Sequence, residues 1–64
     1  MPEIFVHILE GQTLEAKRAL VKDITAAVVK NTNVPTEAVI VSIVESAKTA
    51  KSKGGILFSD LGPR

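Results

Sequence analysis

The chain has 64 residues, a formal net charge of +1 at neutral pH and no cysteine. The near-zero charge argues against a nucleic-acid-binding protein, which carries a strongly basic surface, and the lack of cysteine excludes disulfides. A lone histidine does not form a metal-ligand cluster, so we predict no metal site.

The length predicts a single domain, residues 1–64, that is too small to be stable without support. A chain of this size buries only ~60% of the surface that its unfolded form exposes. Because 45% of the residues are apolar, we expect copies of the chain or a sister chain to cover apolar surface that one protomer cannot bury. No apolar run approaches the ~20 residues of a membrane span, and no signal peptide is evident. We therefore expect a cytoplasmic protein without a membrane partner.

The first predicted strand runs from Glu3 to Leu9 and is apolar on both faces. A period of two separates its side chains into two sets, Ile4, Val6 and Ile8 against Phe5, His7 and Leu9. Strands that are covered on both sides are typical of parallel or mixed sheets. Gly11 marks the turn that follows.

A helix is predicted from Leu14 to about Asn31, because apolar residues recur there at steps of three and four. Thr13 is a suitable N-cap, since its hydroxyl can accept a hydrogen bond from a free N–H of the first turn. Asn33 can adopt the left-handed conformation that ends many helices. Thr36–Ala38 is predicted to form a single helical turn.

The second predicted strand is Val39–Val44, which is also apolar on both faces. Strand, helix and strand form a β-α-β unit, so we predict an α/β fold with parallel strands and a right-handed crossover. The helix can cover one face of this two-stranded sheet. Two strands alone are too few for a stable sheet, so we expect other subunits to extend it and to bury its other face.

The last third of the chain begins with the small, polar, lysine-rich segment 45–53, followed by the turn signal Gly54-Gly55. Ile56–Phe58 is a short apolar segment, and the chain from Ser59 to Arg64 is predicted to be a tail. The apolar segment has no room in the protomer's own core. We expect it to form a hairpin or arm that packs against a neighbour.

Pro2 is the candidate catalytic residue. Cytosolic processing generally removes Met1 before a small residue, which would leave a free prolyl secondary amine that can act as a base. An ordinary α-amine has a pKa of ~8, and apolar surroundings such as Ile4, Ile8 and Leu9 would lower it toward neutrality. The alternative interpretation is that Pro2 merely begins a strand, where proline is common.

The sequence resembles the 4-oxalocrotonate tautomerase family along essentially its whole length, without a gap. The matching features are Pro2, the run His7–Gly11, Lys17, Leu20, Pro35, Glu45, Ala47-Lys48 and Gly54-Gly55. The resemblance implies β-α-β protomers that pair into dimers with a four-stranded sheet, and a hexamer built as a trimer of dimers. It also implies an isomerase without a cofactor, in which Pro2 transfers a proton between the enol and keto forms of a small 2-oxo acid.

The chain departs from the family where the resemblance places the substrate pocket. Leu9, Gln12, Ile40, Lys51 and Lys53 occupy those positions. Family members that act on diacids have arginine at the positions of Gln12 and Ile40, and an aromatic residue at that of Lys51. Neither glutamine nor isoleucine can bind a carboxylate with two parallel hydrogen bonds, as arginine does, so a diacid substrate is not expected.

Several alternatives remain open from the sequence. Lys51 and Lys53 either supply cations to a carboxylate or carbonyl oxygen, or belong with Lys48 to a solvated loop. His7 is interpreted as a hydrogen-bonded core or interface residue rather than an acid or base. The missing arginines also suit a weakly catalytic or non-catalytic subunit of a hetero-oligomer. Nucleic-acid binding by the lysine-rich loop is disfavoured, because stacking aromatic residues are absent.

Overall fold

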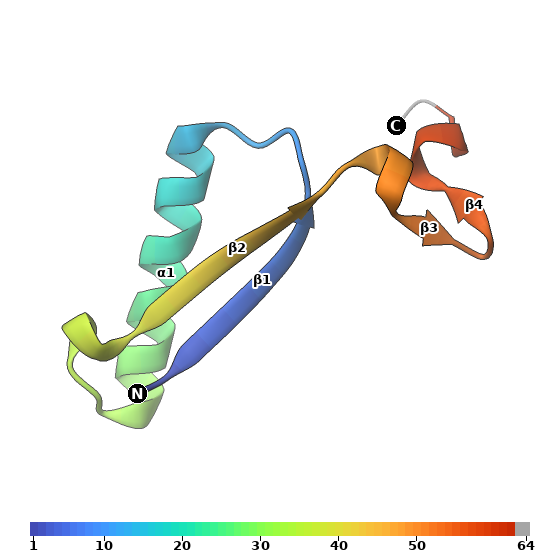
Figure 1. Cartoon of the computed structure of the whole chain (residues 1–64). Helices are drawn as coiled ribbons and strands as arrows, with labels where there is room; N and C mark the ends of the chain where they lie inside the picture. Colours follow the sequence, from blue (N-terminus) through green and yellow to red (C-terminus); the bar gives the residue numbers. More distant parts are fainter. Residues whose placement is uncertain (63–64) are drawn as a thin grey trace.

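An α-helix lies along one face of two parallel strands in the computed structural model, which describes residues 1–62 (Figure 1). Strand β1 spans Glu3–Leu9, helix α1 spans Leu14–Thr32 and strand β2 spans Ile40–Ser46. A 3-10 turn at Thr36–Ala38 leads into β2. The predicted β-α-β architecture with parallel strands is therefore confirmed.

A small hairpin follows this β-α-β unit and projects away from it (Figure 1). Its strands β3 and β4 pair in antiparallel register, with Ser52 opposite Leu57 and Lys53 opposite Ile56. Its elements are a 3-10 turn at Lys48–Ala50, β3 at Ser52–Lys53, β4 at Ile56–Leu57 and a 3-10 turn at Phe58–Asp60. The predicted hairpin is confirmed, and its contact with a neighbour remains a prediction. The predicted tail ends at Arg64, which lies outside the described residues.

The second strand was predicted at Val39–Val44, but β2 starts one residue later and ends two residues later. Val39 belongs to the preceding turn, because its N–H donates to the Thr36 carbonyl at 3.2 Å. At the other end, pairing with β1 continues to Leu9 opposite Ser46, and the Glu10 N–H donates to the Ser46 carbonyl at 2.9 Å. The length of β2 is thus set by its partner strand.

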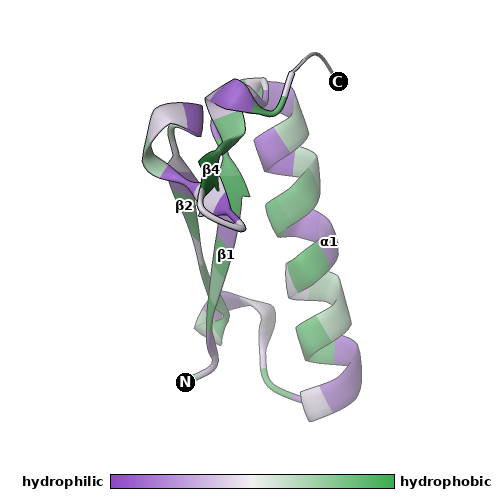
Figure 2. Cartoon of the chain, turned by 90° about the vertical axis from the view of Figure 1, so that its right-hand side faces the viewer, coloured by the Kyte–Doolittle hydropathy of each residue, from purple (hydrophilic) through white to green (hydrophobic). Residues whose placement is uncertain are grey.

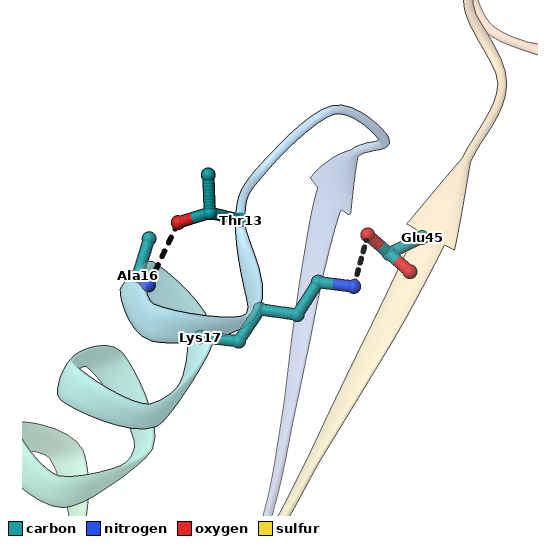
Figure 3. A network of polar contacts seen from close by, with 4 residues as sticks. All are labelled: Thr13, Ala16, Lys17 and Glu45. Carbon is teal, nitrogen blue, oxygen red and sulfur yellow. Dashed lines mark hydrogen bonds and ion pairs between the residues drawn. The ribbon is translucent and has the colours of Figure 1, made fainter.

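Both ends of α1 are capped as predicted. The Ala16 N–H donates to the Thr13 hydroxyl at 3.0 Å, which satisfies one of the free donors at the start of the helix (Figure 3). Asn33 adopts a left-handed conformation with φ of 59°, and its N–H donates to the Val29 carbonyl at 3.0 Å. The helix extends to Thr32, one residue beyond the predicted end.

An ion pair joins the first turns of α1 to the end of β2. Lys17 Nζ lies 2.8 Å from a carboxylate oxygen of Glu45 (Figure 3). Their side chains are 28% and 33% exposed, so solvent screens the pair and its contribution to stability is modest, about 0–1 kcal/mol.

Helix α1 packs on one face of the strands and leaves the other face uncovered by residues 1–62 (Figure 2). On β1, Ile4, Val6 and Ile8 are half-buried, whereas Phe5 and His7 on the opposite face are exposed. Phe5 is 58% exposed, which is unusual for a phenylalanine in the middle of a strand. No residue of the described part is fully buried.

The dimensions of the protomer agree with this shortage of burial. Its Cα radius of gyration is 14.9 Å, and its principal extents are 43 × 23 × 14 Å. A compact domain of this length would have a radius of gyration of about 11 Å. The projecting hairpin contributes further apolar surface, since Ile56 is 50% exposed. This shape is typical of one part of a larger assembly.

We predict that unfolding is coupled to dissociation of an assembly. The apparent melting temperature should rise by about 5 °C or more when the protein concentration is raised a hundredfold, because association stabilises only the folded state. Differential scanning calorimetry over that range measures the shift, and sedimentation velocity gives the mass. A constant melting temperature together with a monomeric mass would contradict this prediction.

We also predict that Thr13→Ala lowers the free energy of unfolding by ~1 kcal/mol per chain, because it removes the hydroxyl that accepts from Ala16. Chemical denaturation at one fixed protein concentration measures the loss. Thr13→Ser is the matched control, since serine keeps the hydroxyl and should retain most of the stability. Equal losses in the two variants would show that the cap does not stabilise the helix.

Candidate functional site

A groove opens where the carboxyl end of β1 meets the first turns of α1. Its volume is about 830 Å³. We call it the carboxyl-end groove, and its lining residues are His7, Ile8, Leu9, Glu10, Gly11, Gln12, Ala16, Lys17, Leu20, Lys48 and Lys51. The carboxyl ends of parallel strands are where open α/β sheets usually bind ligands. The groove is therefore the strongest candidate for a binding site in a single protomer.

The backbone at the groove is shaped by the turn after β1. Gly11 has a φ of 118°, a conformation that residues with a side chain rarely adopt. The turn carries the chain from Leu9 to the N-cap Thr13, and Gln12 lies between them at the groove. Leu9 and Gln12, two of the predicted pocket residues, are thus brought to one place.

Positive charge enters the groove from the segment that follows β2. Lys48 and Lys51 both line it, as does Lys17 from α1. Lys17 already forms an ion pair with Glu45, at 2.8 Å. Of the predicted pocket lysines, the structure brings Lys51 to the groove.

Phe58 is a neighbour of Lys51 that the sequence analysis did not single out. The Phe58 N–H donates to the Lys51 carbonyl at 2.8 Å, which continues the pairing of β3 and β4 by one position. The Lys51 ammonium lies 6.0 Å from the centroid of the Phe58 ring, at the outer limit of a cation–π contact. Gly54-Gly55 is the feature of the sequence that could have revealed this contact, because a turn there places residues 51 and 58 opposite each other.

Lys53 and His7 differ in their surroundings. Lys53 lies in β3, is exposed and is not among the residues that line the carboxyl-end groove. His7 lines the groove but is exposed on the uncovered face of β1. Within one protomer the interpretation of His7 as a core residue is wrong, because α1 covers the opposite face. Its burial at an interface remains a prediction.

Pro2 lies at the other end of the sheet from the groove. The Ile40 N–H donates to the Pro2 carbonyl at 3.0 Å, and Glu3 pairs with Ile40. Pro2 and Ile40, two predicted site residues, are therefore neighbours at the amino ends of the strands. At ~3.3 Å per residue, the seven steps from Pro2 to Leu9 span ~23 Å.

This separation corrects one expectation from the sequence. Ile8 and Leu9 were expected to surround Pro2 and lower the pKa of its amine, but they lie at the far end of the same strand. Ile4 is the one residue of that set that lies close to Pro2 along the strand. In a single protomer, Pro2 and the carboxyl-end groove therefore lie at opposite ends of the sheet.

Two further searches of residues 1–62 concern other classes of site. No three side chains of His, Cys, Asp or Glu lie together there as a group that could hold a metal ion. Within the same residues, no helix has both the length and the apolar character that crossing a bilayer requires.

The family model described as "Tautomerase enzyme" matches residues 2–59 of the chain. A protein of Bradyrhizobium diazoefficiens described as a probable tautomerase is 47% identical over 58 residues, covering 91% of this chain and 87% of that protein. A probable tautomerase of Bacillus cereus is 43% identical over 60 residues, covering 94% of this chain and 98% of that protein.

Solved structures give the same result. YwhB, a homologue of 4-oxalocrotonate tautomerase, is 38% identical, superposes with a TM-score of 0.90 and covers 95% of this chain and 100% of its own. A heterohexamer 4-oxalocrotonate tautomerase from Chloroflexus aurantiacus is 31% identical, with a TM-score of 0.90 and coverage of 97% and 100%. With the family model, the relatives and the fold in agreement, the chain belongs to the tautomerase family of enzymes.

Proposed function

We propose that this protein is an isomerase that interconverts the enol and keto forms of a small 2-oxo acid, with the Pro2 nitrogen as general base. The observation that carries the proposal is the position of Pro2. It directly precedes β1, its carbonyl accepts from the Ile40 N–H, and it is the first residue of the match to the tautomerase family. The proposal requires removal of Met1, because only then is the Pro2 nitrogen a basic secondary amine rather than an amide.

The proposed reaction is a proton transfer in two steps. The lone pair of the Pro2 nitrogen takes the proton of the enol hydroxyl and leaves an enolate. An electron pair of the enolate oxygen then forms the carbonyl, while the electrons of the carbon–carbon double bond move to the carbon that is to be protonated. The prolinium then returns the proton to carbon, which regenerates the free amine. A base of this kind works best when its pKa lies near the working pH. No cofactor takes part in this scheme.

Pro2 and the carboxyl-end groove meet if two copies associate with their β1 strands antiparallel. Such a two-fold arrangement places the start of one strand beside the end of the other. Pro2 and Ile40 of one copy would then face Leu9, Gln12 and Lys51 of the next, with Lys53 on the adjoining hairpin. We propose that dimers of this kind assemble further into a hexamer, which would cover the exposed face that carries Phe5.

We predict that Pro2→Ala abolishes most of the activity. The kcat/KM for ketonisation of phenylenolpyruvate should fall by ~10²-fold or more, the usual contribution of a general base. A spectrophotometric assay, corrected for the reaction in buffer, measures the rate, and intact mass should show that purified protein starts at Pro2.

Pro35→Ala is the matched control, since Pro35 is an exposed proline at the start of a turn outside the proposed site. It should keep the parental rate. Ketonisation that is as fast in Pro2→Ala as in the parent, or a purified protein that retains Met1 and is fully active, would refute the role of Pro2.

A second candidate function is a weakly catalytic subunit of a hetero-oligomer. Two observations favour it. Gln12 and Ile40 stand where the family's diacid enzymes have arginine, and the structural relative from Chloroflexus aurantiacus is a heterohexamer. In this interpretation a sister chain supplies the cations that bind substrate.

Co-expression with a small tautomerase-family chain from the same genome, followed by native mass spectrometry, distinguishes the two candidates. The hetero-oligomer predicts mixed assemblies at a fixed ratio and activity well above that of either chain alone. A stable homohexamer that is as active alone as in the mixture would exclude this candidate and favour the first.

A further inference from the structure

We propose that Lys51, positioned by Phe58, binds the carboxylate of the substrate and makes the site selective for monocarboxylate 2-oxo acids. This inference rests on the proposed isomerase function. It assigns carboxylate binding, for which the family's diacid enzymes use arginines at other positions, to Lys51, with Phe58 as its positioning residue. It distinguishes Lys51 from the other lysines of the segment after β2. It also brings in Phe58, which lies seven residues further along the chain.

The surroundings of the lysines favour Lys51. It lines the carboxyl-end groove and is half-buried, so solvent screens its charge less than that of an exposed lysine. Lys17 is already paired with Glu45 at 2.8 Å. Lys48 lines the groove but is exposed, and Lys53 is exposed and lies outside the groove lining.

Phe58 restrains Lys51 in two ways. The hydrogen bond from the Phe58 N–H to the Lys51 carbonyl, at 2.8 Å, fixes the two residues as a cross-strand pair. The ring centroid then lies 6.0 Å from the ammonium, so the negative face of the ring attracts the charge. A lysine held in this way loses less side-chain freedom when it binds an anion than a free lysine does.

The charge balance of the groove favours one carboxylate. Glu10 and Lys48 line it with opposite charges, and both are exposed. With the Lys17–Glu45 pair set aside, Lys48, Lys51 and Glu10 leave the lining with one surplus positive charge. Lys51 is the half-buried lysine of the two. A substrate with a second carboxylate would leave that group without a matched cation and, near Glu10, facing a like charge.

The test compares an acid with its ester. The kcat/KM for phenylenolpyruvate and for its methyl ester is measured in the full-length protein and in Lys51→Gln, Lys51→Arg, Lys53→Gln and Lys22→Gln. The acid should be preferred by the parent, and Lys51→Gln should reduce that preference about tenfold, mainly through KM, since it removes a charged hydrogen bond. Lys51→Arg should restore most of it.

Two variants control for charge and for the rival lysine. Lys22 is exposed on α1 and outside the groove, so Lys22→Gln removes a positive charge without touching the site and should leave the preference unchanged. Lys53→Gln should have a smaller effect than Lys51→Gln. An undiminished preference in Lys51→Gln, or a larger loss in Lys53→Gln, would overturn the proposal.

The role of Phe58 is tested with Phe58→Leu and Phe58→Tyr. Leucine keeps an apolar side chain but has no aromatic face, and it should reduce the acid preference about two- to fivefold. Tyrosine keeps the face and should retain the preference. Circular dichroism and native mass spectrometry verify that both variants fold and assemble. Equal acid preference in the leucine and tyrosine variants would overturn the role of the ring.

A binding measurement separates failure of this inference from failure of the proposed function. Titration with unreactive 3-phenylpropanoate and with 3-phenylpropanamide is followed by the backbone amide shifts of Gln12 and Lys51. The acid should bind about tenfold more tightly than the amide in the parent but not in Lys51→Gln. Because this readout needs no catalysis, it decides the role of Lys51 even if Pro2→Ala proves as active as the parent. Equal preference in parent and variant would refute it.

Discussion

A single helix can cover only one face of a two-stranded sheet, and the rest of this structure depends on that limit. Both β1 and β2 carry apolar side chains on both faces, yet α1 packs on one of them. Phe5, Ile40 and Val44 consequently remain exposed. Hydrophobic burial is the main favourable term in folding, and here no described residue is fully buried within one chain. The protomer therefore forms its secondary structure without a fully buried hydrophobic core among the described residues.

Local structure was predictable because short-range chemistry determines it. The Thr13 hydroxyl, the left-handed Asn33 and the paired glycines after Lys53 each act within a few residues of chain. Their consequences, the limits of α1 and the turn of the hairpin, agreed with the structure to within one residue. The end of β2 was not predictable in this way, because Ser46 is strand only through its pairing with Leu9.

Three of the predicted pocket residues, Leu9, Gln12 and Lys51, line the carboxyl-end groove, but their distance from Pro2 was not predictable. The residues around Pro2 were inferred from closeness in sequence. In an extended strand, however, residues that are only a few positions apart lie far from one another. Parallel register brings Ile40 to Pro2 although 38 positions separate them in the chain, whereas Leu9 is carried away. Phe58 was missed for the reverse reason: it lies seven positions from Lys51 in sequence but opposite it across the hairpin turn. Its segment was expected to pack against a neighbour.

The placement of Pro2 and Lys51 at opposite ends of the chain's sheet has a genetic consequence. On the proposed function, each reaction centre needs both residues and is shared between two polypeptides. A defective allele would then also inactivate centres to which normal copies contribute. Conversely, two differently damaged chains can complement each other. An assembly that mixes a Pro2 variant with a Lys51 variant would contain some centres in which both residues are intact.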